Sequence, residues 1–207
     1  MRPRVTEQAR ILDAARSCIA ERGFLGASID DIAHAAGVSR ATVYRYAGGR
    51  RALIRDVLLF ECAAAIEAVG AAVDATEDGP GAVRALIATA VDTVGHNQVL
   101  GRAVGRDLRS ILPDLTVDGA ALIARCTGLM VPVLERAAAR GLIAPDGALP
   151  VYAEEIVRFV FGVIHTPMLG VDGQDPEAAA ERGLRLFGPA LHARGGGTGP
   201  HETASVS

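Results

Sequence analysis

The sequence contains no lysine and no tryptophan, and it has few aromatic residues of any kind. All 21 basic residues are therefore arginines, and aromatic residues make up only 4% of the chain. Half of the chain is nonetheless hydrophobic, with heavy use of alanine and glycine. Because β-sheets are usually rich in aromatic and β-branched residues, this composition favours closely packed helices. We expect an all-α fold.

Cysteine and long apolar runs are also scarce. Cys18, Cys62 and Cys126 are odd in number and far apart, which matches neither a disulfide framework nor a set of zinc ligands. No stretch offers the ~20 apolar residues of a membrane helix, and the N-terminal residues lack the apolar segment of a secretory signal. We expect a reduced, cytoplasmic protein without a metal or cofactor, in which each cysteine is a small buried side chain.

The formal net charge of −3 is unevenly distributed along the chain. Residues 1–55 hold ten arginines and five acidic residues, a balance of +5. Residues 56–207 hold eleven arginines and nineteen acidic residues, a balance of −8. A basic segment joined to an acidic body indicates that the N-terminal part meets a polyanion and that the remainder does not.

The first 55 residues predict three short helices with clear start and stop signals. Thr6 is placed to cap the first helix, which Gly23 ends. Residues 28–31, Ser-Ile-Asp-Asp, have the form of a capping box for the second helix. Gly37 supplies the permissive backbone of a tight turn, and Ser39 caps the third helix. Two short amphipathic helices joined by a glycine-containing turn are typical of a helix-turn-helix.

The third helix, residues 40–46, carries the strongest functional signal. Val43 is expected to face the small core, which leaves two arginines and two tyrosines on the outer surface. Tyrosines that pack on sugars and reach phosphates, next to arginines, are typical of a DNA interface. Arg40 and Thr42 lie at the N-terminal end, where a recognition helix reaches base edges in the major groove. The alternative is a solvated helix whose tyrosines are half-buried core.

The rest of the chain predicts further helices, with no strand alternation and no internal repeat. Helical periodicity covers residues 52–72, 82–95, 98–112, 118–141, 150–168 and 175–192. We therefore expect about nine helices in all. They divide into an N-terminal three-helix helix-turn-helix domain over 1–55 and a C-terminal helical ligand-binding and dimerisation domain over 56–193. The polar, glycine-rich residues 194–207 predict a disordered tail.

Four N-terminal segments resemble the DNA-binding domain of TetR-type transcriptional regulators. These segments are Ile11–Ala15, Ala20–Phe24, Ser28–Ala33 and Ala36–Tyr46, in the order and spacing of that family. Beyond residue 60 the resemblance is only in the number and length of the helices. It implies a homodimer whose N-terminal domains bind a palindromic operator and whose bodies bind a small molecule.

The resemblance also implies roles for individual residues. Residues 40–42 take the base-facing positions, while Tyr44 and Tyr46 take positions that contact phosphate or a thymine methyl. Arg50 matches the usual phosphate-binding lysine, and Ser28 matches the phosphate-contacting cap of the second helix. The full predicted DNA-binding set is Ser28, Ser39, Arg40, Ala41, Thr42, Tyr44, Arg45, Tyr46 and Arg50.

One segment departs from the family pattern. The family places a phenylalanine and a polar residue before the basic residue, whereas this chain has Ala47-Gly48-Gly49. That phenylalanine would fill the small core, and truncating a buried phenylalanine typically costs ~3–5 kcal/mol. We therefore expect a marginally stable, mobile N-terminal domain that becomes ordered on DNA.

The body offers candidate ligand-binding and dimer residues. The ligand candidates are polar or polarisable side chains near apolar helices: His96, Arg102, Arg106, Cys126, Met130, Phe159 and His165. Arg102, Arg106 and Arg109 share a face of the helix predicted over 98–112. That face fits an anionic ligand or, the favoured interpretation, a solvated surface paired with acids. The two C-terminal helices are apolar enough to form an intermolecular four-helix interface, with candidate contacts Val160, Ile164, Leu184, Phe187 and Leu191.

These observations favour a ligand-responsive transcriptional repressor that a small molecule releases from its operator. The expected partners are double-stranded DNA, a second copy of the chain and a small-molecule effector, with no membrane. One alternative is a constitutive DNA-binding regulator without a ligand. A small α-helical enzyme is less favoured, because no Ser/His/Asp spacing, glycine-rich phosphate loop or metal cluster is present in the sequence.

Overall fold

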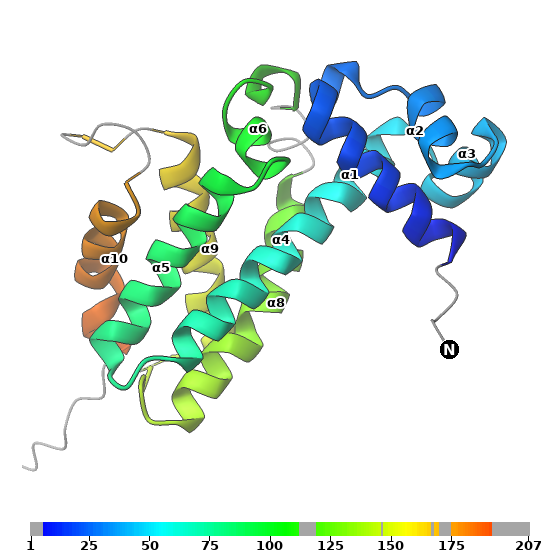
Figure 1. The fold of residues 1–207 in the computed structure, drawn as a ribbon. Coiled ribbons are helices and arrows are strands. Elements are labelled where there is room, and N and C mark those ends of the chain that lie inside the picture. Colours follow the sequence, from blue (N-terminus) through cyan, green and yellow to red (C-terminus); the bar gives the residue numbers. More distant parts are fainter. Residues whose placement is uncertain (1–5, 112–118, 146, 167, 170–174, 192–207) are drawn as a thin grey trace, which may run out of the picture.

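The computed structural model describes residues 6–111, 119–145, 147–166, 168–169 and 175–191. Within these residues the regular structure is entirely helical, which confirms the predicted all-α class (Figure 1). The helices whose full bounds lie within these residues are α1 (Glu7–Gly26), α2 (Ile29–Ala36), α3 (Arg40–Ala47), α4 (Arg50–Asp74), α5 (Gly79–His96), α6 (Leu100–Val104), α8 (Gly119–Ala139), α9 (Leu149–His165) and α10 (Pro176–Leu191). The tail predicted over 194–207 lies outside the described residues.

Helices α1, α2 and α3 form the N-terminal domain, and their predicted caps are confirmed. The Thr6 side chain accepts a hydrogen bond from the backbone of Ala9 at 3.2 Å. Ser28 and Asp31 cap α2 reciprocally, each side chain accepting from the other residue's backbone N–H. Gly37 has φ 65° and ψ 39° at the turn between α2 and α3, a left-handed conformation that favours glycine. The helix-turn-helix is therefore fixed by local signals.

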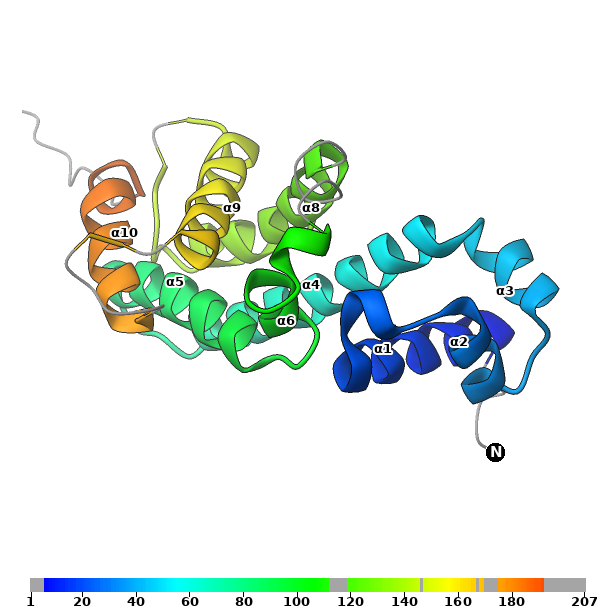
Figure 2. The ribbon, with the colours of Figure 1, turned by 90° about the horizontal axis from the view of Figure 1, so that it is seen from above.

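The helix α4 joins the N-terminal domain to the rest of the molecule. Its first turn packs beside α3, and the remainder runs between α5 and α8 (Figures 1 and 2). We call α5, α6, α8, α9, α10 and the greater part of α4 the body. Seen from above, the N-terminal domain lies to one side of the body, and α10 lies at the opposite side (Figure 2).

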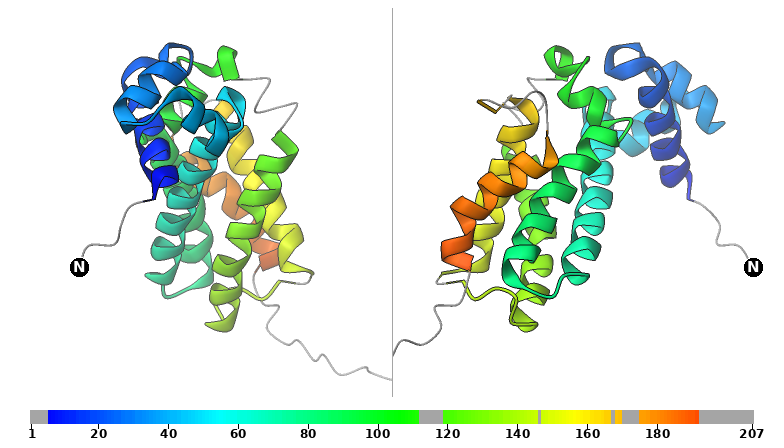
Figure 3. Two further views of the ribbon diagram at one scale, coloured as in Figure 1. Left: turned by 90° about the vertical axis from the view of Figure 1, so that its right-hand side faces the viewer. Right: turned by 60° about the vertical axis from the view of Figure 1, so that its left-hand side comes forward.

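The body is a bundle in which each helix buries an apolar face against its neighbours. Helix α5 packs against α4 and α10, while α8 packs against α4 and α9 (Figure 3). Helix α9 also contacts α5, which closes the bundle. On α10, an added Cβ at Gly183 would overlap the Ile87 side chain of α5, so glycine permits this close approach. No described helix is long and apolar enough to cross a membrane.

The prediction of a single continuous helix over 98–112 is wrong. Helix α6 ends at Val104, and residues 105–107 form a turn before a second helical segment begins at 108. The physical reason is tertiary contact: Arg102 and Asp107 both bind the C-terminal end of α1. Arg102, Arg106 and Arg109 therefore do not share the face of one continuous helix.

Candidate DNA-binding and ligand-binding sites

The outer surface of α3 carries polar and aromatic side chains, as its sequence pattern predicts. Val43 is fully buried in the small core. Tyr44 and Tyr46 remain 47% and 44% exposed, which is high for tyrosines without a partner surface. Arg40 and Arg45 are also exposed on the same helix. This arrangement presents two cations and two aromatic rings on a helix of eight residues.

The two arginines of α3 form only exposed ion pairs. Arg40 lies 3.0 Å from the carboxylate of Asp30, and Arg45 lies 3.6 Å from that of Glu7. Exposed pairs of this kind contribute about 0–1 kcal/mol, so a phosphate or a base edge could replace the carboxylate at little cost. The Arg45 guanidinium also lies 5.1 Å from the centre of the Tyr46 ring.

Three further predicted DNA-binding residues, Ser28, Ser39 and Arg50, already form side-chain hydrogen bonds within the protein. The Ser28 hydroxyl caps α2, and the Ser39 hydroxyl accepts from the backbone of Thr42 at 3.1 Å. The Arg50 guanidinium donates to the carbonyl of Phe24, which ties the start of α4 to the end of α1. Exposed Ala41 completes the outer surface of α3. The DNA-binding roles of this set stay predictions.

The segment that departs from the family pattern adopts a backbone that requires glycine. Gly48 has φ 71° and Gly49 has φ 133° with ψ 178°, and the second conformation is essentially confined to glycine. Ala47 is buried at the C-terminal end of α3, where the expected phenylalanine would have pointed into the core. Mobility of the N-terminal domain stays a prediction.

Helix α6 connects the body to the N-terminal domain through hydrogen bonds to α1. Arg102 donates to the carbonyls of Ala20 and Glu21 at 2.9 and 3.1 Å. In the adjoining turn, Asp107 accepts from the backbone N–H of Phe24 at 3.0 Å. Carbonyls at a helix C-terminus lack intrahelical partners, so a cation placed there is favourable. The arginine predicted as a ligand contact thus binds the N-terminal domain.

A second connection is centred on a buried carboxylate. Glu61 of α4 is 3% exposed and is the one buried charged side chain among the described residues. Its two oxygens bind Arg16 of α1 at 2.5 Å and Asn97, which precedes α6, at 2.7 Å. Asn97 in turn accepts from the backbone N–H groups of Val99 and Leu100, both at 2.9 Å. One side chain therefore links α1, α4 and the start of α6.

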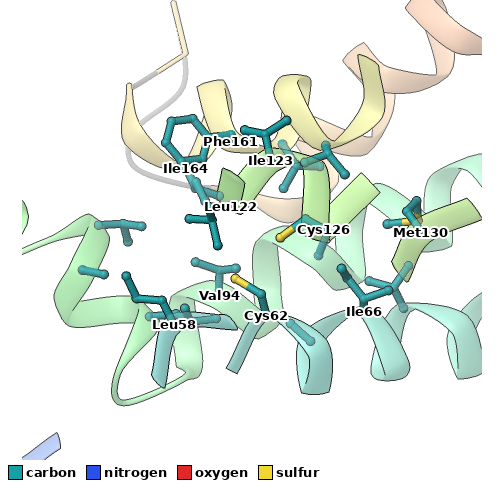
Figure 4. A pocket seen from close by; sticks show the side chains of 18 of the residues that line it. Leu58, Cys62, Ile66, Val94, Leu122, Ile123, Cys126, Met130, Phe161 and Ile164 are labelled. Carbon is teal, nitrogen blue, oxygen red and sulfur yellow. The ribbon is translucent and has the colours of Figure 1, made fainter. Parts of the chain in front are cut away.

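The body contains an apolar cavity of about 110 Å³ between α4, α5, α6, α8 and α9 (Figure 4). Aliphatic side chains dominate its lining, and no arginine, aspartate or glutamate of the described residues lines it. The lining residues are Leu58, Cys62, Ala65, Ile66, Val69, Ala90, Val94, Leu100, Ala103, Val104, Leu122, Ile123, Cys126, Met130, Ile156, Val157, Val160, Phe161, Ile164 and His165.

Two cysteines face one another across this cavity. Cys62 comes from α4 and Cys126 from α8, and their sulfur atoms point toward each other (Figure 4). The hydrogen bond between the thiols, together with burial, raises the pKa of Cys62 well above its usual value, whereas the same hydrogen bond lowers the pKa of Cys126. Residues widely separated in the sequence supply both thiols to one site.

The cavity collects only part of the ligand set predicted from the sequence. Cys126, Met130 and His165 line it. His96 instead lies exposed on α5, with Nδ1 3.1 Å from the Asp92 carboxylate. The structure also places Arg102, Arg106 and Phe159 outside the lining: Arg102 binds α1, Arg106 is exposed in the turn, and Phe159 packs edge-on against Phe187 with ring centres 5.5 Å apart.

The candidate dimer residues face inward within the chain. Phe187 and Leu191 of α10 are buried, and Val160 and Ile164 of α9 line the cavity. Leu184 is half-buried against the same core. The exposed apolar side chains of these two helices are different ones: Val151 at 56% and Leu186 at 61%.

Comparison with known families identifies the N-terminal domain. Residues 11–57 match the model of the bacterial regulatory proteins, tetR family, which covers the helix-turn-helix and the start of α4. The N-terminal domain belongs to the tetR family. The TetR-type helix-turn-helix is therefore α2 and α3, with α3 in the position of the recognition helix.

Solved structures extend the likeness in fold to most of the chain. The TetR family repressor AlkX from Dietzia sp. strain DQ12-45-1b, implicated in biodegradation of n-alkanes, superposes with a TM-score of 0.71 at 22% identity, over 89% of this chain and 94% of that one. The TetR-family repressor QsdR from R. erythropolis gives 0.69 at 21% identity, over 90% and 96%. RolR, in complex with resorcinol, gives 0.67 at 17% identity, over 87% and 86%.

No curated protein matches this chain. Among the described residues, no group of three or more His, Cys, Asp or Glu side chains could hold a metal ion. Cys62 could not be predicted as part of the site, because an apolar stripe on α4 has the same pattern whether it faces a core or a cavity.

Proposed function

We propose that this protein is a ligand-responsive transcriptional repressor that binds a palindromic operator as a homodimer and is released by a small molecule. The observation that carries the proposal is the double role of α4 and α6. Both helices line the cavity, and both hold the N-terminal domain. A ligand that shifts either helix would therefore move α3.

Two short series of contacts connect the cavity to α1 of the N-terminal domain. On α6, the cavity-lining Ala103 is the immediate neighbour of Arg102, which donates to the end of α1. On α4, the cavity-lining Cys62 is the immediate neighbour of Glu61, which binds Arg16 of α1. A ligand can shift the equilibrium between DNA-binding and released conformations only by its difference in affinity for the two.

Dimerisation would supply the second recognition helix. A single helix-turn-helix contacts one half-site, and two of them about 34–36 Å apart reach successive major grooves on one face of the duplex. The outer faces of α9 and α10, where Val151 and Leu186 are exposed, are the surfaces we assign to the interface. The similar structures support this class of function, since AlkX and QsdR are named as repressors and RolR was solved with a small molecule.

The experiment is selection of operator sequences from random double-stranded DNA by the full-length protein, followed by electrophoretic mobility shift with a panel of small molecules. We expect an enriched palindrome and at least one compound that releases it. Absence of any shift at low salt would contradict DNA binding. A shift that resists every compound would instead favour a constitutive regulator.

A further inference from the structure

The surface that lines the cavity is almost entirely apolar. None of the described lining residues is acidic or an arginine, and aliphatic side chains from α4, α5, α6, α8 and α9 supply most of this surface. An ion placed there would lose its hydration without a compensating charge. A hydroxyl or an amine would lose hydrogen bonds to water without replacing them. The cavity therefore disfavours both charged and hydrogen-bonding occupants.

The polar side-chain atoms of the lining residues are already paired or inaccessible. Nδ1 of His165 lies 2.7 Å from the carbonyl oxygen of Phe161. Nε2 of the same ring is buried, with essentially no accessible surface. The thiols of Cys62 and Cys126 are weak hydrogen-bonding groups and are paired with each other. An occupant therefore finds no histidine nitrogen to bind.

Small side chains leave the space that forms the cavity. Ala65 of α4, Ala90 of α5 and Ala103 of α6 all line it and are all buried. Natural protein interiors hold few voids larger than a water molecule, and an empty cavity lowers stability in proportion to its volume. A molecule that fills this space without needing a hydrogen bond would therefore be favoured.

The size of the cavity limits the occupant to a small molecule. The volume of about 110 Å³ is somewhat below the roughly 150 Å³ of an engineered apolar cavity that binds benzene. Met130 contributes an unbranched side chain, which adapts readily to an occupant, and its thioether makes favourable contacts with aromatic rings. A single aromatic ring therefore suits both the volume and the lining.

We infer that the cavity binds a small aromatic hydrocarbon, a single ring without charged or hydrogen-bonding substituents, which is held by burial of its apolar surface among the aliphatic side chains and Met130. This inference rests on the proposed function, in which the cavity is the effector site. It adds the chemical class of the effector, and it sets phenols, amines and acids of the same size apart as poor ligands.

The test is calorimetric titration of the full-length protein, without DNA, with four probes of similar size: toluene, phenol, aniline and benzoate. Phenol and aniline replace the methyl group of toluene by a hydroxyl or an amine. We expect toluene to bind at least about tenfold more tightly than either, because their polar groups would lose hydrogen bonds to water. Benzoate should not bind measurably. Phenol or aniline binding as tightly as toluene, or no binding of toluene up to its solubility limit, would overturn the inference on the wild-type protein alone.

The substitution Ala65→Leu adds a second readout. It adds apolar volume to the lining, so toluene binding should fall by about tenfold or more. The matched control is Ala64→Leu, at the neighbouring exposed position of α4, which should bind toluene as the wild type does. Circular dichroism checks that both variants are folded. Undiminished toluene binding by folded Ala65→Leu would place the toluene outside the cavity and overturn the inference.

Because binding is measured without DNA, the two proposals fail separately. Toluene binding that never releases DNA contradicts the repressor mechanism, whereas release by other compounds without toluene binding contradicts the inference.

Discussion

At the scale of single residues, Glu61 joins the N-terminal domain to the body at an energetic cost that its partners must offset. Its carboxylate is 3% exposed, so it has lost almost all hydration, and it depends on Arg16 and Asn97 for compensation. Removing one partner of a buried charged pair leaves an uncompensated charge, which is strongly destabilising. The Arg16 guanidinium also lies 4.4 Å from the centre of the Phe60 ring.

The substitution Arg16→Met should therefore lower the free energy of unfolding by about 3 kcal/mol. Urea denaturation followed by circular dichroism measures this change. The matched control is Arg84→Met, which breaks the more exposed ion pair with Glu181 and should cost less than about 1 kcal/mol. Equal losses in the two variants would show that Glu61 does not depend on Arg16.

His165 should make the stability of the protein depend on pH. Burial lowers its pKa in the folded state, so between that value and 6.5 the unfolded chain binds more protons than the folded chain. Stability must then rise with pH in this range and fall as the pH drops below 6.5. Thermal unfolding from about pH 8 to pH 5 should show wild type losing stability relative to His165→Phe. A difference between the two proteins that stays constant with pH would contradict the assignment.

At the scale of helices, α3 should separate base recognition from general attraction to DNA. Arg40 lies at the N-terminal end of α3, where its ion pair with Asp30 is exposed and replaceable. Arg40→Ala should relax base preference at one position of each half-site, at a cost of about 1–3 kcal/mol for the specific site. Competition between selected and random DNA measures the preference. Arg125→Ala, which removes an exposed arginine from α8, should leave it unchanged.

Helix α6 should transmit the state of the cavity to α1. Arg102→Ala removes the two hydrogen bonds to the end of α1 without altering a residue that lines the cavity. We expect the effector to bind the free protein about as tightly as before, while its release of DNA weakens, because couplings of this kind amount to about 1–3 kcal/mol. Calorimetry and mobility shift measure the two quantities. Arg106→Ala, in the adjoining turn, is the control and should preserve release.

The N-terminal helices could be predicted because their signals are local. Thr6, Ser28 and Ser39 bind backbone groups three residues away, so the sequence alone shows where each helix begins. The end of α6 could not be predicted in this way. It depends on Arg102 and Asp107 binding residues of α1 that are more than eighty positions earlier in the chain. Helical periodicity carries no information about such contacts.

The candidate site was less predictable than the fold for a related reason. Polar side chains such as His96 and Arg106 are conspicuous in a sequence, but the structure places both on the surface. The cavity is lined mainly by apolar side chains of the kind that also form cores. The hydrophobic pattern of a single helix does not show whether space remains between that helix and its neighbours. His165 could be suspected as a polar group on an apolar helix. Its free Nε2 becomes visible only once Phe161 is seen to bind Nδ1.

At the scale of the whole molecule, the distribution of charge agrees with the arrangement of the two parts. The balance of +5 belongs to residues 1–55, whose described helices α1, α2 and α3 lie to one side of the body (Figure 1). A segment with a balance of −8, residues 56–207, would be repelled by DNA, so attraction is restricted to residues 1–55. Two such domains must then be joined through the body, and α10 lies on the side away from α3 (Figure 2).

The substitution Leu186→Glu should convert the proposed dimer into monomers. Leu186 is 61% exposed on α10, so a charge there costs little within one chain but would be buried without a partner in an interface. Phe187 is unsuitable for this test because it is buried in the core, where a charge would unfold the protein. Light scattering should give half the wild-type mass, and operator affinity should fall because each monomer contacts one half-site. Leu129→Glu, on an exposed position of α8, should leave both properties intact. A dimer that survives Leu186→Glu, with circular dichroism unchanged, would place the interface on other helices.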